Sequence, residues 1–383
     1  MATPVSITSL ASFSPLGNNP ESVWEHYLSG KSIIRPTVIG GKTVPTALLP
    51  GALILEVEAL TASNPNYKHL DKSVLFALLA SRNAVQKAGW DTKDIFGINI
   101  GSSRGATDLF EKHFTEFLET GKTAVQASPA TTLGNISSWV AHDLKSDGPD
   151  ISHSITCSTA LHALLNGVAW LRSGMSNKFL VGGSEAPLTP FTIAQMQAMK
   201  IYSSNEDDYP CRALDLTKTV NTMVLGEGAA MACLQAGRLP GALAYIEGVG
   251  YATEMLQHSV SISADADCMQ KSMRMALKDT KLSDVDAIVM HAPGTIKGDL
   301  SEYNAVHKIF GSNLPLLTTN KWKIGHTFGA SGLLNLELAL LMLQHNHFIP
   351  SPFLPQQAGR PLHKILINAV GFGGNAVSIL VSK

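Results

Sequence analysis

Short runs of β-branched and other apolar residues alternate along the chain with longer segments whose apolar residues recur at helical spacing. The short runs predict strands, since each is bounded by Gly, Pro, Ser or charged residues. We expect these strands at 5–10, 96–101, 151–156, 178–183, 229–235, 242–250, 286–291, 364–370 and 376–382. Helical spacing predicts helices at 73–89, 158–174, 301–310 and 333–343. This alternation is typical of a layered α/β fold.

The chain has 383 residues, more than a single hydrophobic core usually organises. The segment QAGRLPG (235–241) carries Gly and Pro between two predicted strands and is the best linker. We therefore place a boundary near residue 238, which divides the chain into 1–238 and 239–383. Each part holds several strands and helices. This favours a duplicated architecture, although no clear internal repeat demonstrates it.

Charged residues make up only 15% of the chain, with 29 basic and 30 acidic side chains. The balance gives no global field that would attract nucleic acid or a membrane surface. The low charge predicts a large core or an extensive subunit interface. The apolar stretch 333–343 is too short to span a bilayer, and the first residues do not form a signal peptide. We expect no membrane insertion.

Four cysteines, Cys157, Cys211, Cys233 and Cys268, lack CxxC spacing. That argues against a zinc site and a disulfide framework, and it predicts a reduced, cytoplasmic protein. Cys157 stands between a predicted strand and the predicted helix 158–174, where free N–H groups and the helix dipole stabilise a thiolate. The alternative is a small buried cysteine without chemistry. His162 lies on the helix and is expected to pack.

The sequence CSTALHAL at 157–164 resembles the nucleophile segment of β-ketoacyl synthases. Gly148-Pro149 before it and GGSEA (182–186) after it resemble landmarks of that family in the same order, as does the early stretch SFSPLGNNPESVWEHYLSGKS. The resemblance implies a thiolase-like duplicated five-layer α-β-α-β-α fold. It also implies that Cys157 is the nucleophile.

The run HAPGTIKGDLSE begins at His291, at the end of a predicted strand, and resembles the family's His-Gly-Thr-Gly-Thr motif. The resemblance implies that His291 is catalytic and that Thr295 contacts the substrate. Ala292 and Pro293 depart from the motif, so the family's first threonine, a pantetheine contact, is absent. For Asp299 we favour the role of a helix cap, with Glu302 as its capping-box partner.

The run KWKIGHTFGASG resembles the family's lysine followed by Gly-His and Gly-Ala-x-Gly. It implies that His326 is the second catalytic histidine. It also implies that Lys321 pairs with Glu302 and organises the site. The closing NAVGFGGN (368–375) resembles the family's Gly-Phe-Gly-Gly hairpin, in which Asn375 replaces a common threonine.

The resemblance assigns to this hairpin an oxyanion-hole amide and a gating side chain. The residues concerned are Gly371, Phe372 and Gly373. The N–H groups of Cys157 and Phe372 are the implied oxyanion donors. In the stretch 101–114, Asp108 and Phe110 stand where the family has small or aliphatic residues, and we expect both to shape the acyl pocket.

Together these motifs predict a decarboxylating 3-oxoacyl-[acyl carrier protein] synthase of fatty acid or specialised polyene or polyketide biosynthesis. Two neutral histidines suit an enolate, so the chemistry requires no metal or dissociable cofactor. Substrates would arrive on the phosphopantetheine of an acyl carrier protein, for which Lys68 and Lys72 are candidate docking residues. We expect a homodimer or a heterodimer with a related subunit.

Three alternatives compete with this interpretation. A degradative thiolase needs a second cysteine near the C-terminus, but the last cysteine is Cys268. A non-catalytic chain-length factor typically loses the nucleophile, whereas Cys157 is present here. A Rossmann oxidoreductase would depend on GVGYATE (248–254), which lacks the full glycine fingerprint.

Overall fold

A single mixed sheet of ten strands runs through the computed structural model, which describes residues 3–133, 135–255, 262–355 and 360–383. In spatial order its strands are β11 (Leu316–Thr318), β10 (Ala287–Val289), β12 (Lys364–Gly371), β13 (Asn375–Ser382), β9 (Ala244–Thr253), β1 (Val5–Phe13), β8 (Gly228–Ala236), β6 (Lys178–Glu185), β4 (Gly97–Gly101) and β5 (Asp150–Ile151). A small second sheet contains β2 (Arg35–Ile39), β3 (Lys42–Ala47) and β7 (Leu225–Gly226).

The large sheet consists of two halves with the same connectivity. In each half the first strand in sequence lies innermost and is followed outward by the fifth, fourth, second and third. The inner neighbours pair antiparallel and the outer ones parallel in both halves. The two halves meet where β1 pairs with β9 over only three residues. The strand order thus shows the duplication that the sequence could not demonstrate.

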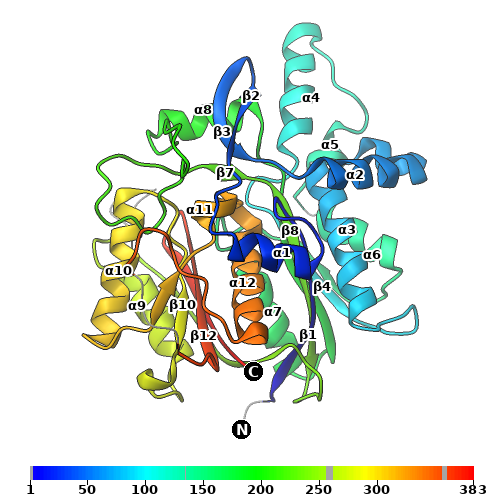
Figure 1. Ribbon diagram of the computed structural model, residues 1–383. Coiled ribbons are helices and arrows are strands. Elements are labelled where there is room, and N and C mark those ends of the chain that lie inside the picture. The colour runs from blue at the N-terminus through cyan, green and yellow to red at the C-terminus, as the bar shows by residue number, and fades with distance from the viewer. Residues whose placement is uncertain (1–2, 134, 256–261, 356–359) are drawn as a thin grey trace.

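Helices cover both faces of each half. They are α1 (Pro20–Leu28), α2 (Gly51–Ser63), α3 (Lys72–Lys87), α4 (Thr107–Thr120), α5 (Ala127–Thr131), α6 (Asn135–Leu144), α7 (Thr159–Arg172), α8 (Pro190–Ala198), α9 (Asp267–Ala276), α10 (Ile296–Phe310), α11 (Lys321–Ile324) and α12 (Ser331–His345). Short 3-10 turns occupy Pro65–His69, Leu282–Asp284 and Phe328–Ala330. In Figure 1, α7 and α12 lie in the centre, with α3 and α6 outside one half and α9 and α10 outside the other. This arrangement is the expected five-layer fold.

The central helix α12 is mostly apolar apart from Asn335 and Glu337, and every residue from Ser331 to Leu343 is buried. Such a helix must be enclosed by protein on all sides. Its leucines join the core of both sheet halves. Among the described residues, no helix is long and apolar enough to cross a membrane.

Most predicted elements are confirmed within a few residues at each end. The strand predicted at 151–156 is wrong, because only Asp150–Ile151 is extended and the following residues turn toward the nucleophile. The helix predicted at 301–310 begins earlier, at Ile296, because the Thr295 side chain accepts a hydrogen bond from Gly298 N and caps it. The small sheet was not predicted, since its strands are short and half exposed. The predicted boundary near residue 238 falls in the link between β8 and β9.

Candidate active site

A strained turn presents Cys157 just before α7. Thr156 has a φ of 47°, in the left-handed region that few non-glycine residues adopt, so the backbone reverses sharply there. The Ser158 hydroxyl donates to the Ile155 carbonyl at 2.9 Å, and the Thr159 hydroxyl donates to the Thr156 carbonyl at 2.6 Å. The turn is thereby fixed from both sides. Cys157 is 6% exposed.

Burial raises the pKa of the Cys157 thiol to about 12, and the nearby Glu185 carboxylate adds to the effect. Lys321 and Arg104 act in the opposite direction but do not outweigh burial. Burial therefore favours the neutral thiol in the resting protein. Burial thus opposes the expected stabilisation of a thiolate by the helix terminus, because it disfavours the charged form.

His291 and His326 lie together although they come from different elements. His291 follows β10, and its ring centroid is 5.1 Å from that of His326, with the ring planes at 81°. The His326 backbone is fixed against the small sheet, since its N–H donates to Val224 O at 2.6 Å and its carbonyl accepts from Gly226 N at 3.2 Å. The Phe328 ring also packs edge to face against the His326 ring, with centroids 5.3 Å apart.

Both imidazoles are neutral. Burial lowers their pKa values well below the ordinary range, and the neighbouring Lys321 lowers them further. Among the described residues, the Nδ1 atom of each ring has no hydrogen-bond partner. Both Nδ1 atoms are buried, so these two ring nitrogens are polar groups that the described protein leaves unsatisfied.

Glu302 holds the backbone that carries His291. Its two carboxylate oxygens accept from His291 N at 3.0 Å and from Ala292 N at 2.8 Å, and Asn368 Nδ2 donates to it at 3.2 Å. Burial raises the pKa of Glu302 to about 7. Glu302 is therefore a buried anchor for the histidine loop and not the capping-box partner that was weighed for it.

Lys321 is fully buried, and its ammonium lies 3.4 Å from the side-chain oxygens of both Asn320 and Asn335. In the described part of the chain its ammonium is not within ion-pair distance of the Glu302 carboxylate, which instead accepts from the backbone around His291, so the pairing implied by the resemblance stays a prediction. The two groups still interact through space, since Glu302 raises the pKa of Lys321. Burial is the larger effect and lowers that pKa to about 8.

Asp299 is not the helix cap that the sequence favoured. One of its oxygens accepts from Gly294 N at 2.9 Å, while the other accepts from Leu214 N at 2.8 Å and forms a buried ion pair with Lys218 at 2.6 Å. The side chain therefore joins the loop after His291 to the segment around Leu214. Thr295 takes the capping position instead.

The closing hairpin between β12 and β13 lies against the nucleophile turn. Thr156 Oγ1 donates to Phe372 O at 3.3 Å, and a Cβ atom on Gly371 would stand only 1.8 Å from that hydroxyl. Only glycine permits this approach. Gly373 turns the chain with a φ of 94°. The Phe372 side chain is 37% exposed, and its gating role stays a prediction.

A cavity of about 360 Å³ collects most of the predicted site residues. Its lining is Cys157, Met199, Ile201, Asn221, Met223, Ile262, His291, Pro293, Thr295, Lys297, Gly298, His326, Phe328, Val370, Gly371 and Phe372. Asp108 and Phe110 do not line this cavity, and their expected role in shaping the acyl pocket stays a prediction. Both lie on α4, where Asp108 borders another surface hollow and Phe110 is exposed and stacks on Phe114.

Sequence reasoning missed Glu185, at the end of β6. Its Oε1 accepts from Ser102 Oγ at 2.5 Å and from the backbone N–H groups of Ser103 and Arg104, while burial raises its pKa to about 7. The Arg104 guanidinium lies over the Phe328 ring at 5.9 Å. The signal was the glutamate within the GGSEA segment, whose resemblance to a family landmark did not by itself indicate a buried carboxylate. Among the described residues, no three His, Cys, Asp or Glu side chains gather to hold a metal ion.

Two family models match nearly the whole chain. The β-ketoacyl synthase N-terminal domain matches residues 2–238, and the β-ketoacyl synthase C-terminal domain matches residues 242–354. The chain belongs to the β-ketoacyl synthase family. Its predicted class, an acyltransferase that performs condensation in fatty acid or polyketide biosynthesis, is thereby confirmed. The predicted thiolase-like fold is confirmed as well.

Curated relatives of this β-ketoacyl synthase cover it from end to end. The 3-oxoacyl-[acyl-carrier-protein] synthase 2 of Coxiella burnetii is 26% identical, over 99% of this chain and 98% of the relative. The protein of the same name from Staphylococcus aureus (strain COL) is also 26% identical, with the same coverage of each chain.

Solved structures share the fold at lower identity. A β-ketoacyl synthase from Burkholderia phymatum superposes with a TM-score of 0.86 at 22% identity, covering 100% of this chain and 99% of the other. The ishigamide ketosynthase/chain length factor gives 0.85 at 19%, covering both chains fully. The ketosynthase ApeO in complex with its chain length factor ApeC, from Xenorhabdus doucetiae, gives 0.79 at 19%, covering 99% and 98%.

The Rossmann alternative is wrong. Residues 248–254 fall largely in β9, which pairs with β13 and β1. A Cβ atom on Gly250 would meet the Ser272 carbonyl of α9 at 1.9 Å. The glycines here serve close packing of a helix on a sheet and form no dinucleotide loop.

Proposed function

We propose that this synthase joins an acyl group carried on Cys157 to a malonyl thioester, with His291 and His326 stabilising the enolate formed by decarboxylation. The observation that carries the proposal is the shared cavity. The buried thiol, the two neutral imidazoles and the Gly371-Phe372 turn all line it. In this proposal, residues 1–238 supply the nucleophile and residues 239–383 supply the histidines.

In the first half-reaction, the Cys157 sulfur bonds to the carbonyl carbon of the incoming acyl thioester. The carrier thiolate leaves and takes the proton that the cysteine gives up. Two backbone N–H groups, those of Cys157 and Phe372, are the proposed donors to the oxygen that becomes negative. This assignment is supported by the contact at Thr156, where the nucleophile turn meets the closing hairpin.

In the second half-reaction, the malonyl carboxylate leaves as carbon dioxide and its electron pair forms an enolate. Neutral imidazoles donate N–H bonds to that oxygen without taking the electron pair away, which suits His291 and His326. The enolate carbon then bonds to the acyl carbon. The Cys157 sulfur is released as the new carbon–carbon bond forms.

We propose that the substrates are delivered on the phosphopantetheine arm of an acyl carrier protein. The relatives are named for such carriers, and Thr295, Asn221 and Lys297 supply polar groups along the cavity wall. Pro293 also lines the cavity, at the position of the missing threonine. That departure supports a specialised substrate, of the polyene or polyketide type, over housekeeping elongation. The four unpaired cysteines suit a reducing compartment such as the cytoplasm.

We propose that the working form is a dimer, with itself or with a related subunit. The helix α4 exposes one apolar face that includes Phe110, Phe114, Phe117 and Leu118. Their spacing of four, three and one residues places them along a single stripe. Such a stripe on a surface helix is typical of an interface. The neighbouring edge of the large sheet ends in the short strand β5.

A chain-length factor is the second candidate, because two similar structures contain such subunits. The retained thiol in the cavity with both histidines favours the catalytic role. Mass spectrometry after incubation with acylated carrier proteins tests the choice. An acyl adduct on Cys157 supports the synthase, while an unmodified thiol beside an active partner subunit would support the chain-length factor.

A further inference from the structure

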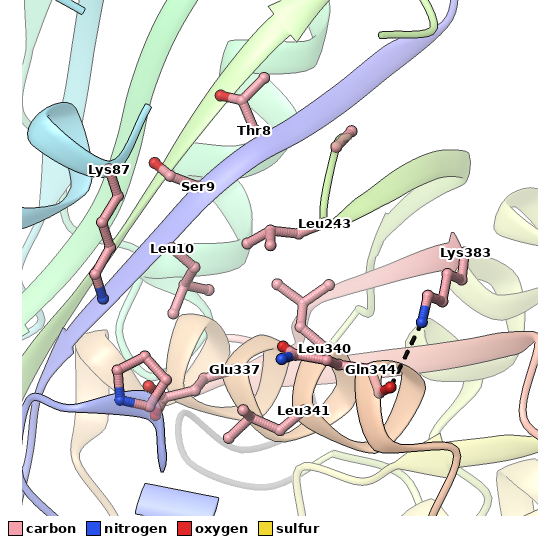
Figure 2. Close-up of a pocket in the computed structure, with 12 residues that line it drawn as sticks. Thr8, Ser9, Leu10, Lys87, Leu243, Glu337, Leu340, Leu341, Gln344 and Lys383 are labelled. Carbon is pink, nitrogen blue, oxygen red and sulfur yellow. Dashed lines mark hydrogen bonds between the residues drawn. The ribbon is translucent and has the colours of Figure 1, made fainter. Parts of the chain in front are cut away.

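A second cavity, of about 330 Å³, opens on the molecule's surface at the junction of the two sheet halves. Figure 2 shows its wall, formed by residues of β1 and α12, with Lys87 reaching in from α3 at the end where Glu337 lies and Lys383 at the other end. Lys383 donates to Gln344 O at 3.5 Å. None of these residues belongs to the cavity around Cys157.

Glu337 is the buried end of this cavity. It is 5% exposed, and among the described residues its Oε2 atom has no hydrogen-bond partner. A glutamate in the middle of an otherwise apolar core helix costs stability unless its polar atoms are satisfied. The groups that face it are Lys87 from α3, Ser12 from β1 and Tyr27 from α1.

From Glu337, buried polar groups continue inward toward the reaction site. The Tyr27 hydroxyl interacts with both Glu337 and the Asn320 amide, but it lacks a well-formed hydrogen bond to any described residue. Asn320 in turn lies 3.4 Å from the Lys321 ammonium through its Oδ1 atom. We call these four side chains the polar row: Glu337, Tyr27, Asn320 and Lys321.

All members of the polar row are at least 95% buried. Within the described part of the chain, Glu337 Oε2, Tyr27 Oη and Asn320 Nδ2 each lack a hydrogen-bond partner. Buried polar atoms are normally satisfied by protein or by ordered water, so water is the expected partner of these three atoms. At its inner end, Lys321 influences the charge state of Cys157, His291 and His326.

The proposed reaction consumes one proton in each turn. The malonyl group arrives as a carboxylate and leaves as neutral carbon dioxide, and its electron pair ends in the new carbon–carbon bond. The bond between the acyl carbon and Cys157 Sγ breaks with its electron pair on sulfur. That sulfur must gain a proton to restore the neutral thiol, because burial strongly disfavours its charged form.

We propose, on the basis of the proposed condensation, that the polar row delivers this proton from the surface cavity to Cys157. The Lys321 ammonium gives its proton to Sγ, directly or through water, as the carbon–sulfur bond breaks. Lys321 is then reprotonated from Glu337 by way of water held at Tyr27 and Asn320. Glu337 takes the next proton from solvent at the cavity with Lys87.

The order of proton affinities supports this direction. Burial raises the pKa of Glu337 to about 7, and burial lowers the pKa of Lys321 to about 8. Both lie below the pKa of about 12 for the Cys157 thiol. The Cys157 sulfur therefore binds the proton more tightly than either group, and the similar pKa values of Glu337 and Lys321 let these two groups exchange protons near neutral pH.

The test compares the rate of the first turnover with the rate of later turnovers, in the wild-type full chain and in the Glu337→Gln and Tyr27→Phe variants. Each protein is given hexanoyl and malonyl thioesters of a bacterial acyl carrier protein, with Gln344→Ala on the same cavity as the matched control. We expect one product per site at the wild-type rate, because Lys321 starts protonated. Later turnovers should slow by roughly ten- to a hundredfold. Small proton donors such as imidazolium should restore the rate of the later turnovers in the Glu337→Gln variant.

Two results would overturn the relay while leaving the synthase assignment intact. One is a steady-state rate in both variants that equals the wild-type rate. The other is an equal loss of the first and later turnovers without rescue by buffer, which would mean that the side chains only support the fold. A wild-type protein that forms no product with these carriers, and takes up no acyl group on Cys157, would instead contradict the proposed function itself.

Discussion

The imidazole rings of His291 and His326 stand edge to face, with centroids 5.1 Å apart, although 34 residues separate them in sequence. Neither ring is charged, because burial lowers both pKa values. Two neutral N–H donors in one cavity can donate hydrogen bonds to an enolate oxygen while a thioester is bound beside it. This relationship sets the first prediction.

Replacing His326 by alanine should reduce decarboxylation of malonyl carrier protein by roughly a hundredfold or more, because an aimed donor to a developing oxyanion is lost. Acylation of Cys157 should suffer much less, since its oxyanion is served by backbone N–H groups. Release of labelled carbon dioxide and acyl loading are measured in parallel. The exposed His307→Ala change is the control. Equal loss of both steps would remove the assigned role.

Replacing Cys157 by alanine should abolish covalent loading and leave the fold intact, because the new side chain fits the same buried turn. Intact-protein mass spectrometry after incubation with acyl carrier protein gives the result. Cys268→Ala changes another buried cysteine, on α9, and should load normally. An acyl adduct on the Cys157 variant would rule out this residue as nucleophile.

Alkylation of Cys157 by iodoacetamide should be slow at neutral pH and should rise with pH beyond the range of an ordinary thiol. The sign follows from burial, which raises the pKa of the folded thiol from 9.0 to about 12, so the reactive thiolate is scarcer than in the unfolded chain. The unfolded protein is the reference. Rapid alkylation that levels off near neutral pH would show that the helix terminus prevails over burial.

Changing Phe114 to aspartate should convert a dimer into monomers, because the charge would be buried in the proposed α4 interface. Light scattering coupled to gel filtration measures the mass. Met275→Asp places the same charge on an exposed apolar residue of α9 and serves as control. An active wild-type species near the 40.8 kDa chain mass would refute the dimer.

Charge reversal at Lys68 and Lys72 should raise the Michaelis constant for carrier protein at low salt through slower association, because carriers are acidic. Both lysines are exposed near α4 and α3. The double change at Lys271 and Lys278, also exposed, is the matched control. An unchanged constant would place the docking surface elsewhere.

The strands of the large sheet were predictable because each is a short apolar run between breakers, and a buried strand tolerates little else. The small sheet escaped prediction because β2 is mostly exposed and contains Pro36. The site was accessible through motifs that carry unusual chemistry, such as Cys157 before a helix. Glu185 and Glu337 were not recognised as chemically significant, because burial of a carboxylate depends on contacts that are distant in sequence.

The matching strand order of the two halves has a consequence for how this enzyme can be divided. Cys157 lies between the third strand and the central helix of its half, and His326 occupies the corresponding place before α12. The starts of these two helices touch, since a Cβ atom on Gly332 would meet Leu161 N at 3.0 Å. Chain cleavage in the 237–243 link would therefore yield two fragments that are each inert. Activity would return only when the two fragments reassemble. The pair would then work as a split enzyme, whose recovered activity reports that its two halves have bound each other.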